Sequence, residues 1–252
     1  MPLTRKIALI QFDAVPEERS ANLAHMQRLS RASAAAGARW IMFHESTLTD
    51  YTPRLSELAE PVPSGGATTA MADLAKQHDC YISFGLSEVE NERYYISQVF
   101  VGPSGYFYHY RKTWICRKET DEGYRNEWKR YDPGAGPELF DVDGVNATCF
   151  ICSDGVARRC IERAAALRPQ IVFFPHNVRG GVEPANMAER AMTINAPILL
   201  TNRVGHAWTH GSPGGTAVIS ARGEVVAQAN MEGKEEILLH ELEIPDERTS
   251  QP

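Results

Sequence analysis

The 252-residue sequence contains no long hydrophobic run. Its first apolar stretch, Ile7-Ala-Leu-Ile10, has only four residues, which is too short for the core of a signal peptide. No later stretch approaches the ~20 residues of a membrane-spanning helix. Cysteine is also scarce, because the five cysteines are an odd number at scattered positions and suit a reducing compartment better than a disulfide framework. We therefore expect a soluble, cytoplasmic protein with no membrane partner.

Positive charge is in the minority. The chain has 26 Lys and Arg against 32 Asp and Glu, a formal net charge of -6 and a pI near 5.8. Because a nucleic-acid phosphate backbone attracts a basic surface, this balance argues against a nucleic-acid partner. The sequence also lacks repeats, linkers and low-complexity tracts. We therefore expect a single domain over residues 1–252, a length that allows a large core.

Short apolar runs alternate with helical patterns along the chain. Runs bounded by turn residues predict strands, whereas apolar residues that recur near every 3.6 positions predict helices. The predicted strands cover residues 6–12, 39–43, 81–86, 93–101, 105–110, 137–142, 149–151, 170–175, 197–203, 214–220, 224–229 and 236–242. The predicted helices cover residues 19–36, 70–78, 156–168 and 187–194. This alternation predicts a layered α/β fold, with a long loop without clear period over 115–135.

Cys152 lies at a predicted junction between a strand and a helix. Backbone N–H groups at a helix start stabilise a thiolate and can hold an oxyanion. The alternative is that Cys152 is a small buried apolar residue, like most free cysteines. The spacing Cys149-x-x-Cys152 also invites a zinc or redox interpretation. However, residues three apart on a strand face opposite sides and no second Cys/His pair stands at ligand spacing, so we predict no metal site.

Two further polar residues follow predicted strands. Glu45 comes after the strand at 39–43, and Lys112 comes after the strand at 105–110. Ligands usually bind at the carboxyl ends of strands in α/β sheets. A thiol nucleophile, a carboxylate that moves protons and a fixed cation are the groups that acyl transfer to cysteine needs. The alternatives are a helix-capping glutamate and a solvated lysine, and His44 competes with Glu45 for the role of base.

Four motifs resemble those of the nitrilase, or carbon–nitrogen hydrolase, superfamily. In chain order they are Phe43-His44-Glu45-Ser-Thr-Leu48-Thr49-Asp50-Tyr51, Tyr110-Arg111-Lys112-Thr113-Trp114, Glu127-Trp-Lys-Arg-Tyr131-Asp-Pro133-Gly134 and Ile151-Cys152-Ser153-Asp154. Segments at 189–205 and 215–229 also look like the family, so the resemblance runs from about Lys6 to about Leu242. Four motifs in the family's order are far more specific than any one of them.

The resemblance implies a four-layer α-β-β-α sandwich of the nitrilase type, joined through helices into a homodimer or a higher homo-oligomer. It implies that Glu45 is the general base and that Cys152 is the nucleophile, which forms a thioester. Lys112 would stabilise the oxyanion together with the backbone N–H of Ser153. Glu127 would be a second carboxylate that positions Lys112 or the substrate. No metal or organic cofactor is expected, and water is the second substrate.

Three positions depart from the family's pattern. His44 stands where the family has proline before the glutamate, and Asp50 stands where it has glycine. The cysteine motif continues with Ala157-Arg158-Arg159 rather than with Phe-Pro-Glu or Trp-Pro-Glu. Because these positions shape the pocket wall, the family's substrates do not transfer directly to this chain.

The cysteine motif inclines the substrate towards an amide. Cys152-Ser-Asp looks more like the Cys-Asn-Asp of N-carbamoyl-amino-acid amidohydrolases than like the Cys-Trp-Glu of nitrilases. We therefore expect a small amide or N-carbamoyl substrate, with nitrile hydrolysis by the same residues as the alternative. Substrate-selecting residues are expected on the loops at 50–60, 115–130, 176–184 and 205–213.

Arginine side chains are the candidates for holding a substrate carboxylate, because a guanidinium binds it with two hydrogen bonds. They are Arg158, Arg159, Arg179 and Arg203. The alternative for the first two is a solvated or dimer-facing helix surface. Asn177 and Arg179 follow a buried strand and are candidate substrate-binding residues, although an ordinary solvated loop has the same composition.

Two classes of function fit these patterns. A cysteine amidohydrolase predicts ammonia release that Cys152→Ala abolishes. A binding or regulatory protein on the same fold predicts that iodoacetamide labels Cys152 no faster than an ordinary thiol.

Overall fold

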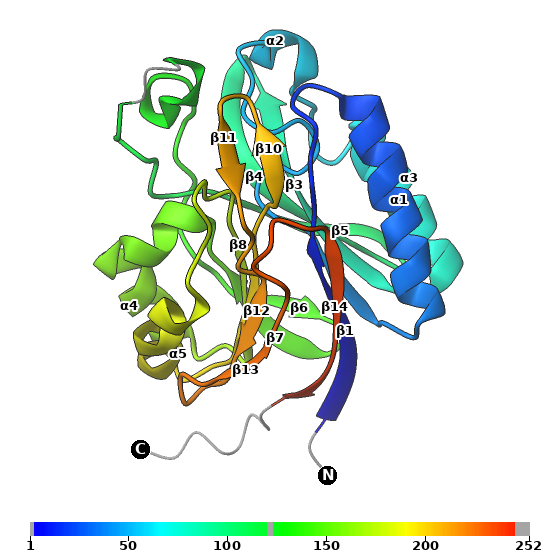
Figure 1. The fold of residues 1–252 in the computed structure, drawn as a ribbon, viewed down its shortest axis with the longest axis vertical. Helices are drawn as coiled ribbons and strands as arrows, with labels where there is room; N and C mark the ends of the chain where they lie inside the picture. The colour runs from blue at the N-terminus through cyan, green and yellow to red at the C-terminus, as the bar shows by residue number, and fades with distance from the viewer. Residues whose placement is uncertain (1–2, 120–122, 245–252) are drawn as a thin grey trace.

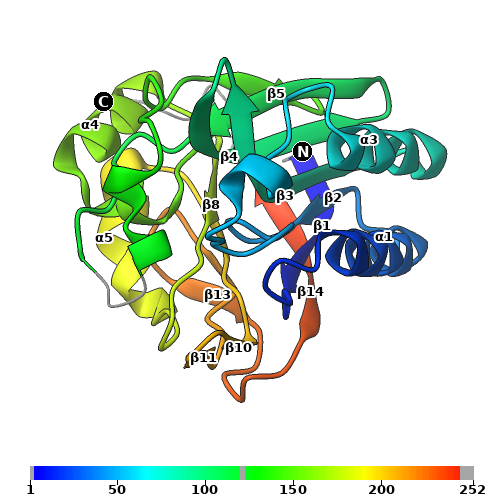
Figure 2. The same ribbon diagram turned by 90° about the horizontal axis from the view of Figure 1, so that it is seen from above.

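The chain builds two six-stranded sheets that pack face to face (Figures 1 and 2). The computed structural model describes residues 3–119 and 123–244, so the predicted loop over 115–135 lies partly outside the described residues. The first sheet has the order β14 (Glu236–Ile244), β1 (Leu3–Gln11), β2 (Trp40–Met42), β3 (Tyr81–Glu90), β4 (Arg93–Gly102) and β5 (Gly105–Arg111). The second has the order β13 (Val225–Gln228), β12 (Ala217–Ile219), β9 (Ile198–Thr201), β8 (Ile171–Pro175), β7 (Val145–Cys149) and β6 (Phe140–Val142).

The two sheets share one pattern of strand directions. In each sheet the three consecutive strands β1-β2-β3 or β7-β8-β9 are parallel, and the outer strands pair antiparallel. Parallel neighbours need a crossover, and helices supply it on the outer faces. The helices are α1 (Arg19–Ala35) and α3 (Gly66–His78) on the first sheet, and α4 (Arg158–Leu167) and α5 (Ala188–Ile194) on the second.

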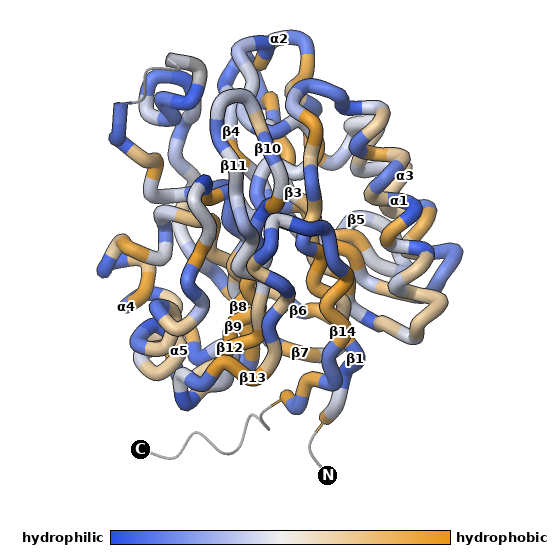
Figure 3. Tube along the Cα trace, in the orientation of Figure 1, coloured by the Kyte–Doolittle hydropathy of each residue, from blue (hydrophilic) through white to orange (hydrophobic). Residues whose placement is uncertain are grey.

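Burial on both faces explains why the central strands are continuous apolar runs. In β1, Ile7 and Leu9 point into the core between the sheets, whereas Ala8 and Ile10 point into the core under α1 and α3. A third core lies between the second sheet and its helices. Figure 3 shows the hydrophobic segments concentrated on the strands in the centre of the molecule. The predicted four-layer α-β-β-α sandwich is therefore confirmed.

Several boundaries differ from the predictions. The strand expected at 149–151 ends at Cys149, and a short 3-10 helix, η3 (Cys152–Val156), precedes α4, which starts at Arg158 rather than 156. Val156 is 68 % exposed and does not belong to the buried side of that helix. Patterns of this length do not distinguish a 3-10 turn from the first turn of an α-helix.

Some elements were not predicted. They are the four-residue helix α2 (Leu55–Leu58), the 3-10 turns η1 (Gly123–Arg125), η2 (Glu127–Lys129) and η4 (Pro184–Met187), and the hairpin of β10 (Gly205–Ala207) and β11 (His210–Ser212). Each of these strands and turns has only three or four residues, too few to display a period. Within the described ranges, no helix has both the length and the apolar character needed to cross a bilayer.

Candidate active site

Glu45, Lys112 and Glu127 meet in a buried cluster between the two sheets. Lys112 Nζ lies 2.7 Å from Glu45 Oε1 and 2.9 Å from Glu127 Oε1. The Tyr51 hydroxyl contacts the same two oxygens, at 2.9 Å for Glu45 and 2.7 Å for Glu127. Glu45 and Lys112 are completely buried. Three ionisable side chains from different parts of the sequence thus share one set of hydrogen bonds.

Strand ends and one glycine place these side chains. Glu45 follows β2 and Lys112 follows β5. A Cβ on Gly85 of β3 would lie 2.3 Å from the Ser46 nitrogen and 2.6 Å from the His44 carbonyl oxygen. The Glu45 loop therefore packs directly against β3 only because residue 85 has no side chain. Glu127 begins η2, and its second oxygen accepts a hydrogen bond from the Cys116 N–H at 2.9 Å.

The charges in this cluster influence one another. Burial raises the pKa of Glu45, and Glu127 raises it further, while Lys112 acts in the opposite direction. Burial acts to lower the pKa of Lys112, but the carboxylates of Glu127 and Glu45 outweigh it, so the pKa of Lys112 lies well above its usual value. Lys112 is therefore a permanent cation, and Glu45 is a carboxylate whose raised pKa makes it a better proton acceptor than a solvated glutamate.

Asp154 connects Cys152 to the lysine segment. Its Oδ1 atom accepts hydrogen bonds from the Thr113 N–H (3.0 Å) and the Trp114 N–H (2.5 Å), and its Oδ2 atom accepts one from the Ile151 N–H (2.9 Å). Cys152 comes directly after Ile151 and has a φ of 45°. Residues other than glycine rarely adopt this left-handed backbone conformation, so the turn is strained and the hydrogen bonds of Asp154 must hold it in place.

The acidity of Cys152 differs from the expectation. Burial and the neighbouring Glu45 raise the pKa of the thiol well above its usual value, although Lys112 and the nearby backbone N–H of Asn177 act to lower it. The expected thiolate at a helix start was therefore wrong. A five-residue 3-10 turn offers little stabilisation compared with a dry site that contains two carboxylates. With its pKa raised in this way, the Cys152 side chain carries a proton near pH 7.

His44, the other candidate for the base, is bound to the backbone of its neighbour. Its Nδ1 lies 2.7 Å from the carbonyl oxygen of Glu45, and its ring packs on Phe12 at 6.0 Å between centroids. Burial, together with the nearby Arg203, lowers the pKa of His44 to about 4. The imidazole is neutral near pH 7 and braces the Glu45 backbone.

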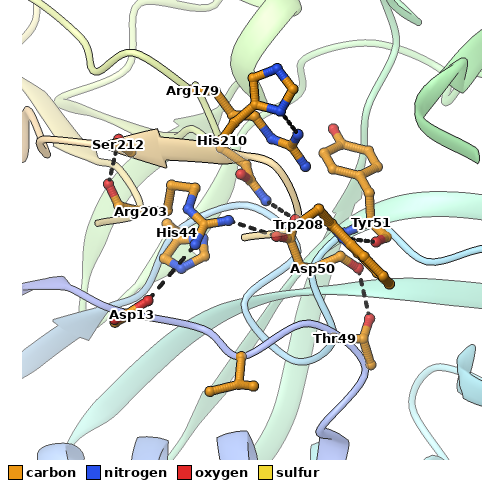
Figure 4. A network of polar contacts seen from close by, with 12 residues as sticks. Asp13, His44, Thr49, Asp50, Tyr51, Arg179, Arg203, Trp208, His210 and Ser212 are labelled. Carbon is orange, nitrogen blue, oxygen red and sulfur yellow. Dashed lines mark hydrogen bonds and ion pairs between the residues drawn. The ribbon is translucent and has the colours of Figure 1, made fainter. Parts of the chain in front are cut away.

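The candidate arginines have separate surroundings. Arg158 pairs with Glu162 at 2.7 Å on an exposed face, and Arg159 lies over the ring of Trp114 at 4.6 Å. Arg203 is buried and forms an ion pair of 2.6 Å with Asp50. Arg179 contacts His210 at 2.7 Å, on the side of the site where β10 and β11 lie (Figure 4).

The two remaining candidates lie beside the cysteine turn. Asn177 is buried, and its Nδ2 atom donates to Asp50 Oδ1 at 2.8 Å. Its Oδ1 atom has no hydrogen-bond partner within residues 3–119 and 123–244, and neither has Oε2 of Glu45. The Ser153 hydroxyl donates to the Trp114 carbonyl oxygen at 2.6 Å, which leaves its backbone N–H as the group for an oxyanion. These two buried acceptors would be satisfied by hydrogen bonds from a polar ligand bound between them.

Sequence reasoning assigned no role to Tyr51 or Asp154, and it placed Asp50 only in the pocket wall. All three stand inside recognised motifs, but each also binds a residue that is distant in sequence, and no local pattern marks those contacts. Among the described residues, no group of three His, Cys, Asp or Glu side chains is arranged to hold a metal ion. Cys149 lies in the core between the sheets, where its sulfur faces the Phe150 carbonyl oxygen at 3.4 Å.

Comparisons with known proteins show what this chain is similar to. A nitrilase of Pyrococcus abyssi is 25% identical over 244 residues, which are 95% of this chain and 90% of that protein. An (R)-stereoselective amidase of a Pseudomonas species is 25% identical over 239 residues, or 92% of this chain and 82% of that protein.

Solved structures share the fold. A double mutant of the amidase from Nesterenkonia sp. AN1, in complex with acrylamide, superposes with a TM-score of 0.83 at 19% identity and covers 97% of this chain and 92% of that one. A CN-hydrolase superfamily protein from Xanthomonas campestris gives a TM-score of 0.82 at 16% identity, covering 94% and 90%. The family description carbon-nitrogen hydrolase matches residues 6–250. Because that match spans nearly the whole sequence, the chain belongs to the carbon–nitrogen hydrolase family.

Proposed function

We propose that this protein hydrolyses a small primary amide to an acid and ammonia through a thioester on Cys152. The observation that carries the proposal is the contact of one buried ammonium, that of Lys112, with two carboxylates, those of Glu45 and Glu127, beside a cysteine. A structural ion pair would need one carboxylate, and burying three charges is costly. Such a cluster is typical of a site that moves protons.

In the first half-reaction, Glu45 takes the thiol proton as the Cys152 sulfur attacks the amide carbon. The negative charge that develops on the substrate oxygen is stabilised by the Lys112 ammonium and the backbone N–H of Ser153. Glu45 then donates its proton to the amide nitrogen. The carbon–nitrogen bond breaks, ammonia leaves, and the acyl group remains on the sulfur as a thioester.

In the second half-reaction, Glu45 accepts a proton from water as the water oxygen attacks the thioester carbon. The carbon–sulfur bond breaks, the acid is released, and the sulfur recovers its proton from Glu45. Glu127 holds the Lys112 ammonium through both steps, and Tyr51 holds both carboxylates. The raised pKa of Glu45 makes its carboxylate a stronger base, which supports its role as the acceptor of the thiol proton.

The charges near the sulfur favour an uncharged substrate. Glu45, Glu127 and Lys112 together carry a net negative charge, while Asp50 and Arg203 cancel each other. A substrate carboxylate next to the cysteine would therefore meet repulsion. An N-carbamoyl amino acid is the second candidate, because a carboxylate further out could reach Arg179. Because one relative of this chain is a nitrilase, nitriles are also tested as substrates.

The deciding experiment is an ammonia-release assay on small amides, N-carbamoyl amino acids and nitriles. We expect release from at least one amide, no release with Cys152→Ala, and an intact-mass increase equal to the acyl group when the reaction is quenched. A panel without any ammonia, together with ordinary iodoacetamide reactivity at Cys152, would instead identify a binding or regulatory protein on this fold.

A further inference from the structure

Asp50 forms a buried ion pair that the proposed chemistry does not use. Its Oδ2 atom lies 2.6 Å from Nη1 of Arg203, a residue 153 positions later in the chain. Asp50 is fully buried and Arg203 is only 1% exposed. Figure 4 shows the guanidinium directed at the carboxylate, below the β10–β11 hairpin. Burying both charges is costly unless their geometry and their other hydrogen bonds are good, so this pair requires a reason.

The backbone at Asp50 is equally unusual. Its φ of 54° lies in the left-handed region, where glycine is favoured and where a residue with a side chain is strained. Glycine would relieve this strain and remove the buried charge at once. The chain instead keeps a carboxylate there and supplies an arginine to neutralise it.

The second oxygen of Asp50 reaches both halves of the candidate site. Its Oδ1 atom accepts hydrogen bonds from Nδ2 of Asn177 at 2.8 Å and from the backbone N–H of Tyr51 at 2.7 Å. The Asn177 backbone N–H is near enough to the Cys152 sulfur to lower the pKa of the thiol. The Tyr51 hydroxyl meets the carboxylates of Glu45 and Glu127. One carboxylate is thus a single residue away from the nucleophile and a single residue away from its base.

We propose that Asp50, neutralised by Arg203, is a positioning residue that holds Asn177 and Tyr51 and so sets the place of Cys152 relative to Glu45. Hydrogen bonds to a charged acceptor are shorter and stronger than neutral ones, so a buried carboxylate fixes two donors more firmly than an amide would. The inference rests on the proposed function. It adds a residue that touches no reacting atom but acts through two residues that do.

The main test is a double-mutant cycle of the full-length protein with Asp50→Asn and Asn177→Ala. Because a displacement of about 1 Å can cost about 100-fold in rate, we expect Asp50→Asn to lower kcat on the best amide by at least about 10-fold, with KM changed less than about 3-fold. In the Asn177→Ala background, the same substitution should lower kcat less than about 3-fold. Effects that multiply instead would overturn the proposal, because a charge acting through space does not need Asn177.

A matched control separates positioning from stability. Asp143 also has a positive φ, 57°, and also pairs with arginines, at 2.6 Å from Arg5 and 2.9 Å from Arg39. Asp143 lies before the start of β7 and Cys152 lies after its end, so the control residue is at the opposite end of that strand from the cysteine. We expect Asp143→Asn to lower the melting temperature and to leave kcat unchanged. A fall in kcat equal to that of Asp50→Asn would overturn the proposal.

A second pair of variants covers the case in which Asp50→Asn does not fold. Arg203→Lys keeps a cation beside Asp50 and should retain at least about 5-fold more kcat than Arg203→Met. Equal losses in the two would overturn the proposal. The double-mutant cycle can also be measured without a substrate, from the rate at which iodoacetamide alkylates Cys152. Coupling between Asp50 and Asn177 in that rate supports the inference even if no amide is hydrolysed, whereas independent effects overturn it. The failure of this inference can therefore be distinguished from the failure of the proposed function.

Discussion

The carboxylate of Asp154 accepts the backbone N–H of Thr113 at 3.0 Å, so one side chain joins the segment of Lys112 to the turn of Cys152. The same carboxylate accepts three further hydrogen bonds, from the Trp114 and Ile151 N–H groups and the Tyr110 hydroxyl. Asp154 is completely buried. Asp154, which is itself part of the Cys152 turn, therefore ties that turn to the backbone segment that follows Lys112.

Asp154→Ala should be destabilising and inactivating. It leaves buried N–H donors without an acceptor, which we expect to cost about 3 kcal/mol in the free energy of unfolding. The freed turn should also lower kcat by at least about 100-fold. Urea denaturation and the ammonia assay measure the two effects. The control is Asp141→Ala, because Asp141 is exposed and, within the described part of the chain, accepts a single hydrogen bond, from the Gly144 N–H at 3.2 Å. Equal stability losses in both variants would contradict the role assigned to Asp154.

The pH dependence of kcat should report on Glu45. Burial raises the pKa of this carboxyl from its usual 4.5, and the base must be deprotonated to accept the thiol proton. Activity should therefore fall as the pH drops, with the acid limb centred above pH 4.5. Glu45→Gln should abolish ammonia release. His44→Asn should leave the limb in place, because the pKa of His44 is about 4 and its ring is already neutral in that range. A limb at or below pH 4.5 would argue against Glu45 as the base.

Tyr51→Phe should lower activity more than stability. The substitution removes the hydroxyl that binds both Glu45 and Glu127, so that among the described residues Lys112 alone would still bridge the two carboxylates. We expect kcat to fall about 10-fold and the free energy of unfolding to fall by about 1 kcal/mol. Tyr131→Phe is the comparison, since Tyr131 packs edge-on against Tyr51 and binds Ser87 instead. Similar losses of kcat in both would mean that aromatic packing matters rather than the Tyr51 hydroxyl.

Arg179 should distinguish the two substrate classes. If the substrate is a neutral amide, Arg179→Gln should change KM less than about 3-fold. If it is an N-carbamoyl amino acid whose carboxylate reaches this guanidinium, KM should rise by at least about 10-fold, the loss expected for a charge-assisted pair. Parallel titrations of an amide and its carboxylate-bearing analogue make the measurement. Arg158→Gln is the control, because Arg158 lies on an exposed face and pairs with Glu162.

Local patterns were sufficient for most of the architecture. The helix expected at 19–36 is α1 over Arg19–Ala35, and the hairpin expected at 93–110 is β4 and β5. These elements are long and strongly patterned, so their own composition specifies them. The short hairpin of β10 and β11 was not predicted, because three residues on each side carry no period. Its place follows instead from contacts such as that of Trp208 Nε1 with the Tyr51 carbonyl oxygen at 3.1 Å.

The sequence by itself determined the fold family, the order of the strands and helices, and the four motifs that carry Glu45, Lys112, Glu127 and Cys152. Residue types and their spacing are enough to predict these features, because the features depend on local conformation and on resemblance to a known family. Only the tertiary structure decided that the pKa of the Cys152 thiol is raised, that His44 binds the Glu45 carbonyl oxygen, and that Asp50 and Arg203 form a pair. The pKa and the contacts of a side chain depend on burial and on charged groups that the fold brings together from distant positions. They therefore cannot be read from its neighbours in the chain.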